Sequence, residues 1–273
     1  MKHLPLAGAL ALSGISLLGV SATTSRSYAA EVPAVNGTIG ASYNSHFVSY
    51  GGDVWGGGEE IFGRQSTTFV HAHFDLVFDV LTLNLGVRAD VNDNASSRIG
   101  SDIQEIDVYA GAEFTTGMLT VGAMYQQWYY LSDKEQVVDI HAILNDVPLW
   151  GFQLRPRVHW HMRVAENGPQ KEGHVVVASV TPGKSIGSSG VFLSFPAGAG
   201  FFLTKFYKGG PETGYAYSYF GAAVSIPLKF VPDNYGALAI NVAVTYYATE
   251  RGALPFNVAG DFPTASVGIS YYF

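Results

Sequence analysis

Four histidines form two closely spaced pairs, and this spacing is the first feature of the sequence that could support chemistry. His71 and His73 flank one alanine, and His159 and His161 flank one tryptophan. Residues two apart on a strand point to the same side and lie about 7 Å apart, so each pair could chelate a transition metal. The spacing supplies no third ligand, and we therefore expect the histidines to line a polar face of a sheet. No metal and no other cofactor is assigned.

The second histidine pair lies within residues 149–164, where apolar and polar side chains alternate strictly. Because successive strand residues point to opposite sides, the alternation defines two faces. One face carries Trp150, Phe152, Leu154, Pro156, Val158, Trp160 and Met162, and the other carries Gln153, Arg155, Arg157, His159, His161 and Arg163. The run exceeds the roughly 9–11 tilted residues that cross a bilayer as a strand. It predicts a transmembrane strand with lipid on one side and a polar lumen on the other.

Length and composition fit one large β domain. The chain has 273 residues, of which 48% are hydrophobic, with 32 Gly, 16 Tyr and 17 Phe. Beyond the N-terminal region no segment approaches the roughly 18 consecutive apolar residues of a membrane helix. A net charge of -7 argues against nucleic acid as a partner, because a nucleic-acid surface would be basic. The absence of cysteine excludes disulfides and thiolate chemistry.

The first 29 residues have the pattern of a secretory signal peptide. Lys2 and His3 precede an apolar stretch at residues 4–20, and Ser27 and Ala29 are small residues at the positions that a signal peptidase reads. We expect cleavage after Ala29, with Ala30 as the competing site. Residues 30–273 then form the mature β domain.

Twelve alternating segments follow, and their connections alternate between long and short. The expected strands cover residues 38–50, 65–79, 82–91, 103–115, a segment after Gly117, 136–144, 149–164, 173–181, 190–196, 214–230, 237–247 and 264–273. A tight turn is expected at Asn145 and Asp146, and residues 197–213 are expected to form a long connection. Across residues 173–213 the pattern leaves a count of ten or fourteen strands open. The prediction is an all-β, transmembrane, antiparallel up-and-down β-barrel of about 12 strands, with short periplasmic turns and longer extracellular loops.

The C-terminal segment carries a family resemblance. Val267, Ile269, Tyr271 and Phe273 alternate, and the sequence stops on the aromatic residue. This resembles the terminal recognition strand of Gram-negative outer-membrane proteins, and the whole chain resembles small outer-membrane barrels of the porin type. The resemblance implies location in the cell outer membrane and recognition of the last strand by the barrel assembly machinery.

The inward charges are the candidate functional residues. A twelve-strand barrel has a backbone radius of roughly 12 Å, so its side chains leave a narrow passage or none. The expected pore-lining residues are Arg155, Arg157, His159, His161, Arg163, Glu105, Asp107, Glu113, Asp139, Asp75, His71, His73, Arg88 and Asp90. They could create a transverse field that selects small polar solutes, or they could pair across a closed lumen and hold the barrel together.

Three functions remain open on the sequence alone. The first is a monomeric channel for small polar solutes, set in outer-membrane lipid. The second is a closed structural or adhesion barrel acting through its loops, with Trp55 and the loop around Pro255 and Phe256 as contacts. The third is a lipid hydrolase, which the inward direction of most histidines disfavours and for which only His46 and His174 remain unassigned. We expect no enzyme and assign no catalytic residue.

Overall fold

A computed structural model describes residues 34–61, 63, 65–97, 99–130, 133–145, 147–165, 173–207, 213–232 and 235–273. The signal peptide expected at residues 1–29 lies outside these described residues, as does Asp146. Within the described residues, no helix is long and apolar enough to cross a membrane.

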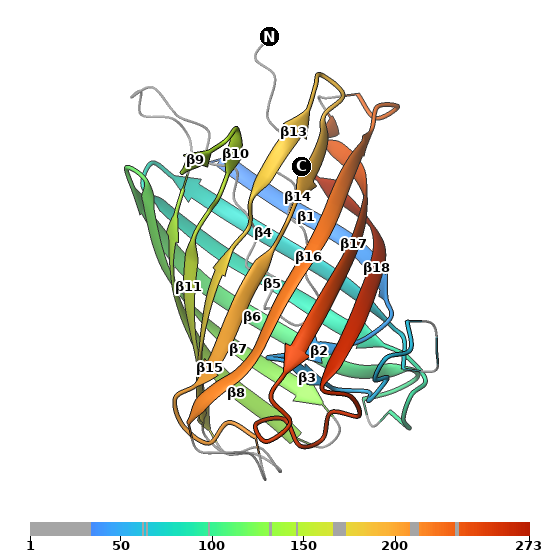
Figure 1. Cartoon of the computed structure of the whole chain (residues 1–273). Helices are drawn as coiled ribbons and strands as arrows, with labels where there is room; N and C mark the ends of the chain where they lie inside the picture. The colour runs from blue at the N-terminus through green and yellow to red at the C-terminus, as the bar shows by residue number, and fades with distance from the viewer. Residues whose placement is uncertain are drawn as a thin grey trace.

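The described chain is a closed antiparallel β-barrel (Figure 1). The barrel is built from β1 (Ala34–Asn44), β4 (Thr67–Phe78), β5 (Leu81–Val91), β6 (Ile103–Thr116), β7 (Leu119–Tyr130), β8 (Asp133–Leu144), β11 (Arg157–Ala165), β12 (Gly173–Val180), β15 (Ala197–Phe202), β16 (Gly214–Leu228), β17 (Ala237–Thr249) and β18 (Asp261–Tyr272). Each strand pairs with its neighbours in this order, and pairing of β1 with β18 closes the ring. The prediction of an all-β barrel of 12 strands is confirmed.

Four of the barrel strands continue toward the periplasmic end as short separate segments. These are β9 (Pro148–Leu149), β10 (Phe152–Gln153), β13 (Gly183–Ile186) and β14 (Val191–Ser194), which repeat the neighbour order of β8, β11, β12 and β15. A proline lies at or beside each interruption, namely Pro148, Pro156, Pro182 and Pro196. Proline has no backbone N–H to donate to the ladder, so the breaks follow from the sequence.

The outer face of the barrel is apolar because every second strand residue is apolar. Val70, Leu85, Ile140, Val158 and Val244 are exposed on it. Exposed aromatic residues flank this belt at both ends: Tyr43, Tyr125, Tyr129, Trp160, Phe201, Tyr215 and Tyr246 toward the long loops, and Phe78, Phe114, Phe195, Phe230, Tyr235 and Phe273 toward the short turns. An apolar band between two aromatic girdles is the surface that a transmembrane barrel presents to lipid.

The turn before β10 differs from the expected one. The chain reverses at Trp150 and Gly151, which have φ angles of 50° and 80°, and Leu149 pairs with Phe152 across them. Two consecutive positive φ angles make the tight hairpin turn whose twist matches that of the strands. The chain therefore reverses later than at the predicted turn of Asn145 and Asp146, of which Asp146 lies outside the described residues. The prediction of a single strand over residues 149–164 is wrong. Trp150 lies at the tip of the turn and is 90% exposed.

The region of uncertain strand count is a hairpin of two interrupted strands. Segments β12 and β13 lead to a turn at residues 187–190, and β14 and β15 return. Residues 197–202 are therefore a barrel strand, which corrects the expectation of a long connection there. Inward-facing Val175 and Val177 explain why β12 does not alternate in polarity, since its inner face is as apolar as its outer face.

The first long loop does not extend away from the barrel. The expected strand over residues 38–50 ends at Asn44, and a small hairpin of β2 (Val48–Ser49) and β3 (Gly52–Asp53) follows. Val48 and Tyr50 are buried in a cluster with barrel residues Trp128, Tyr217 and Phe262. Figure 1 shows β2 and β3 within the outline of the barrel, at the end opposite the short turns.

Candidate functional site

The inner surface of the barrel divides into two walls of different chemistry. The charged wall consists of the inward residues of β4 to β8 and β11, which include every pore-lining residue expected from the sequence except Arg155. The uncharged wall consists of the inward residues of β12, β15 to β18 and β1, where glycine, alanine, serine, threonine, asparagine, valine, phenylalanine and tyrosine occur. The polar lumen is therefore charged on one side only.

An arginine-centred cluster lies on the charged wall near the end with the long loops. Arg88 on β5 donates to Asp107 on β6, with its Nε 2.9 Å from Oδ2, and contacts Glu105 at 3.6 Å. The guanidinium also lies over the ring of Phe69, 4.9 Å from its centroid. The register places Arg88 directly opposite both Asp107 and His71, so this cluster follows from strand pairing alone.

Two histidine–carboxylate contacts lie on the same wall, nearer the end with the short turns. His73 Nε2 is 2.9 Å from Asp75 Oδ1, while its other ring nitrogen is 3.2 Å from the hydroxyl of Tyr109. His141 Nε2 is 3.1 Å from Glu113 Oε1. Each contact pairs an expected inward acid with a histidine, so both acids have a polar partner on this wall.

A second arginine holds a long loop inside the barrel. Arg163 on β11 pairs with Glu135 on β8 and donates through Nη1 to the carbonyl of Phe206 at 2.7 Å. Its guanidinium also lies 4.1 Å from the centre of the Phe206 ring. Glu135 was not among the expected pore-lining residues, although its position alternates inward with Asp139.

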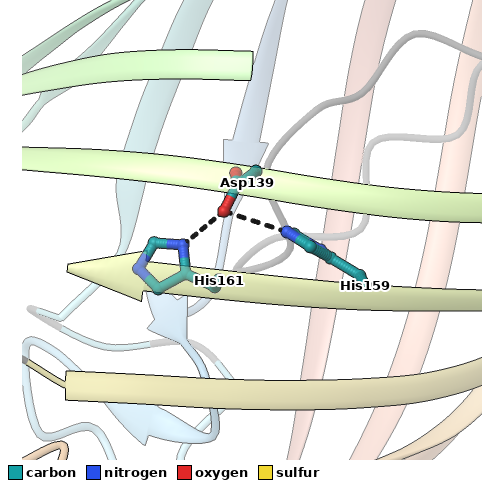
Figure 2. A group of neighbouring side chains, drawn as sticks. All are labelled: Asp139, His159 and His161. Atoms are coloured by element: carbon teal, nitrogen blue, oxygen red, sulfur yellow. Dashed lines mark hydrogen bonds and ion pairs between the residues drawn. The ribbon is translucent and has the colours of Figure 1, made fainter. Parts of the chain in front are cut away.

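Asp139 joins the second histidine pair into a compact group. Its Oδ1 atom is 3.0 Å from His159 Nε2 and 2.7 Å from His161 Nδ1 (Figure 2). The register places Asp139 on β8 directly opposite His161 on β11. The exposed fractions of the three residues are 0 to 2%, so the group is shielded from solvent.

Tyr50 reaches this group from the first loop. Its hydroxyl oxygen lies 2.6 Å from His161 Nδ1, and the two ring centres are 4.1 Å apart. Tyr50 has a φ angle of 45° in the turn between β2 and β3, a conformation that non-glycine residues seldom adopt. No sequence pattern indicates this contact, because it joins residues 111 positions apart.

The other expected pore-lining residues occupy defined places. His71, Arg157 and Asp90 all lie on inward strand positions, and Asp90 accepts hydrogen bonds from Trp55, Thr67 and Asn92. Arg155 is the exception, because it lies in the break between β10 and β11 with a φ angle of 47°. The predicted strand position of Arg155 is therefore wrong.

Three long loops contact one another at the long-loop end of the barrel. The Tyr207 hydroxyl donates to the carbonyl of Ser49 at 2.7 Å, which joins the loop after β15 to hairpin β2–β3. Asn257, in the loop after β17, donates to the carbonyl of Gly51 and accepts from the backbone of Asp53, each at 2.9 Å. We call these contacting parts of residues 45–61, 203–207 and 250–260 the loop plug.

Two titratable groups lie inside the loop plug. His46 accepts from the Ser45 hydroxyl at 2.8 Å, and its Nε2 donates to the carbonyl of Gly58 at 3.1 Å. Burial lowers the pKa of His46, partly opposed by the charge of Asp53. Burial raises the pKa of Asp53, although the backbone N–H of Gly58 donates to its carboxylate. Both shifts favour the uncharged forms in the docked loop.

Similarity to known proteins is limited to distant solved structures. No family model matches the chain, and no curated protein matches it. Among solved structures, the NanC porin has a TM-score of 0.47 at 8% identity, covering 87% of this chain and 99% of the other. LpxR from Salmonella typhimurium has a TM-score of 0.47 at 10% identity, covering 86% and 100%. The translocator domain of autotransporter NalP from Neisseria meningitidis has a TM-score of 0.46 at 10% identity, covering 88% of each chain. The likeness is confined to the barrel fold.

The closed ring, the apolar outer band and the aromatic girdles define a small outer-membrane β-barrel in contact with lipid.

Proposed function

We propose that this outer-membrane barrel is a gated, non-enzymatic channel for the passive diffusion of small polar solutes. The observation that carries the proposal is the asymmetry of the lumen. Small uncharged residues such as Ala223, Ser225 and Ala243 face a wall of ionisable groups, and charged side chains that line a lumen can select polar solutes. In this proposal the expected pore-lining residues on the charged wall contact the solute.

The cost of the charged wall supports a functional role for it. Ion pairs shielded from water contribute little net stability, and apolar side chains of similar volume often stabilise a protein as well or better. Ionisable residues at membrane depth are therefore retained mainly where they serve transport or binding. A barrel that needed only to be closed could use apolar residues at these positions without loss of stability.

The loop plug supplies the proposed gate. Tyr50 and Phe206 are buried inside the barrel and meet edge to face, with ring centres 5.5 Å apart. They are anchored to the wall by His161 and Arg163. Closure thus depends on a few polar contacts between loops and wall, and loss of these contacts would open the outer end.

Planar-bilayer recordings test the gate. We expect the wild-type protein to show brief openings and Tyr50→Ser to spend a larger fraction of time open. Tyr125→Ser is the matched control, because Tyr125 faces lipid. If both the wild type and Tyr50→Ser are silent at high salt, the channel is excluded and the barrel acts through its surface.

Ion selectivity tests the charged wall separately. Arg157→Ala removes a cation from the lumen, so the permeability ratio should shift toward cations. Lys184→Ala removes a cation from an exposed position on β13 and should leave the ratio unchanged. Equal shifts in both variants would contradict contact between solute and Arg157.

We also propose that the protein works as a monomer, and that residues 1–29 are removed on export. In the same proposal, the barrel assembly machinery recognises the last strand through Phe273. Phe273 pairs with Gly37 through two backbone hydrogen bonds, which adds a structural role at the closing seam. Phe273→Leu keeps those bonds, so reduced membrane assembly of this variant would favour recognition of the aromatic ring. Normal assembly would exclude it.

A further inference from the structure

Asp139, His159 and His161 are shielded from solvent and gather around one carboxylate oxygen, and a role in lining the proposed channel does not explain this arrangement. Among the described residues, this is the one set of three potential metal ligands whose donor atoms all lie within 4.8 Å of one another. We propose that these side chains bind a divalent transition-metal ion, with Zn²⁺ as the best match, and that the bound metal fixes hairpin β2–β3 against the barrel wall. Metal binding here does not depend on whether the barrel conducts solutes.

The donor atoms select the class of metal. Two imidazole nitrogens and one carboxylate oxygen form a ligand set suited to Zn²⁺ and its neighbours in the first transition row. Ca²⁺ and Mg²⁺ prefer sites built from oxygen alone, and Cu⁺ prefers sulfur. The chemistry of the three side chains therefore excludes the abundant hard cations and Cu⁺.

The geometry needs only a small adjustment to admit an ion. Bonds to Zn²⁺ of about 2.0–2.2 Å at tetrahedral angles place neighbouring donor atoms about 3.3–3.5 Å apart. The observed separations from Asp139 Oδ1 are 2.7 and 3.0 Å. Figure 2 shows the carboxylate oxygen between the two rings, which approach from the next strand. Side-chain rotations that move the donor atoms apart by about 0.3–0.8 Å would open the required space.

Tyr50 provides a fourth donor at the same point. Its oxygen is 2.6 Å from His161 Nδ1, which is the ring nitrogen that also faces Asp139. A phenol oxygen at this place can complete a tetrahedral set directly or through a water molecule. Because Tyr50 belongs to hairpin β2–β3, a metal at this point would connect the loop plug to β8 and β11.

Neighbouring side chains already hold the proposed ligands in place. The amide of Gln126 donates to the second carboxylate oxygen of Asp139, and the Trp128 indole donates to Gln126 at 3.1 Å. The Trp128 ring also stacks on His161, with centres 5.3 Å apart. Such outer support fixes ligand orientation and is typical of built metal sites.

The first histidine pair shows what the site requires beyond spacing. His71 lies opposite Arg88, whereas His161 lies opposite Asp139, a carboxylate that also contacts His159. The two pairs share strand spacing and inward direction, so His71 and His73 serve as an internal control.

Zinc binding by the purified, full-length barrel in detergent tests the site. The protein would be refolded with ZnCl₂ and dialysed against metal-free buffer, the retained zinc measured by mass spectrometry, and its affinity measured by chelator competition. We expect one zinc per chain for the wild type and for His71→Gln and His73→Gln. We expect affinity about 100-fold weaker for Asp139→Asn, His159→Gln and His161→Gln. A heat-dependent shift on SDS gels would verify that each variant is a closed barrel.

A second readout tests the connection to the loop. Zn²⁺ should slow hydrogen exchange in residues 45–60 of the wild type and leave exchange in Asp139→Asn unchanged. The site is refuted if the folded wild type retains no zinc, or if zinc loss is equal in the His71→Gln and His161→Gln variants. Unchanged exchange in a zinc-loaded wild type would refute the connection between metal and hairpin.

Discussion

The two histidine pairs have the same spacing and the same inward direction, yet the barrel uses them differently. His71 faces Arg88 across β4 and β5, and Arg88 is itself paired with Asp107. His161 faces Asp139 across β8 and β11, and Asp139 also contacts His159. The identity of the residue on the neighbouring strand, and not the local spacing, therefore decides what an alternating pair of histidines can do.

The largest expected effect on stability follows from removing Arg88, the cation opposite His71 of the first pair. Arg88→Leu leaves Asp107 and Glu105 buried without their cation, so the free energy of unfolding should fall by about 3–5 kcal/mol. Urea unfolding in detergent micelles, followed by tryptophan fluorescence, measures this change. Adding Asp107→Asn should recover part of the loss, whereas Lys184→Leu at an exposed position on β13 should change little. An Arg88→Leu barrel as stable as the wild type would contradict the structural role of this cluster.

A smaller effect is expected when each pair loses its acid in metal-free buffer. Asp139→Asn weakens hydrogen bonds to two imidazoles in a site of 0% exposure, so it should destabilise the barrel by about 1–3 kcal/mol. Asp75→Asn should cost less than about 1 kcal/mol, because His73 keeps its contact with Tyr109. The same urea experiment measures both losses. Equal losses would show that the two pairs are equivalent, and a larger loss for Asp75→Asn would contradict the comparison.

The smallest expected effect comes from His46, an imidazole outside the barrel wall. Burial lowers the pKa of His46 below its ordinary value of 6.5, so docking of the first loop is most favourable at neutral pH and weakens as the pH falls below that value. Burial raises the pKa of Asp53, whose contribution has the opposite sign and is lost as the pH rises through its docked value.

Hydrogen exchange of residues 45–60 measures this dependence. After correction for intrinsic rates, exchange should rise severalfold between pH 7.5 and pH 5.5. His46→Gln keeps a donor for the Gly58 carbonyl but does not titrate, so its exchange should change less. An identical pH response in both proteins would exclude His46 as the cause.

The barrel itself was predictable because its outer face must be apolar at every second residue. Val267, Ile269 and Tyr271 alternate outward as lipid contact requires, and the same constraint acts on every strand. The inward directions of Arg88 and Asp107 followed from the same period of two. Whether a strand side chain points inward or outward is thus a local property that the sequence pattern predicts.

The pairing of Asp139 with the histidines was not predictable, because it depends on where the chain turns. A two-residue turn at Asn145 and Asp146 would place Asp139 opposite Phe152, whereas the turn at Trp150 and Gly151 leads to pairing with His161. Tryptophan is an unusual residue for a positive φ angle, so the sequence favoured the wrong turn. The contacts of Tyr50 were not predictable either, because the inward folding of a loop depends on residues that are distant in sequence.

The loop plug has a consequence for the order of events during assembly. It joins segments near residues 50, 207 and 257, which are distant in sequence and meet inside the ring. Bringing such distant segments together costs conformational entropy. This cost is smaller once the strands between them are paired. The loop plug should therefore form last. Shielding of Tyr50 from solvent would then report that assembly of the newly inserted barrel is complete.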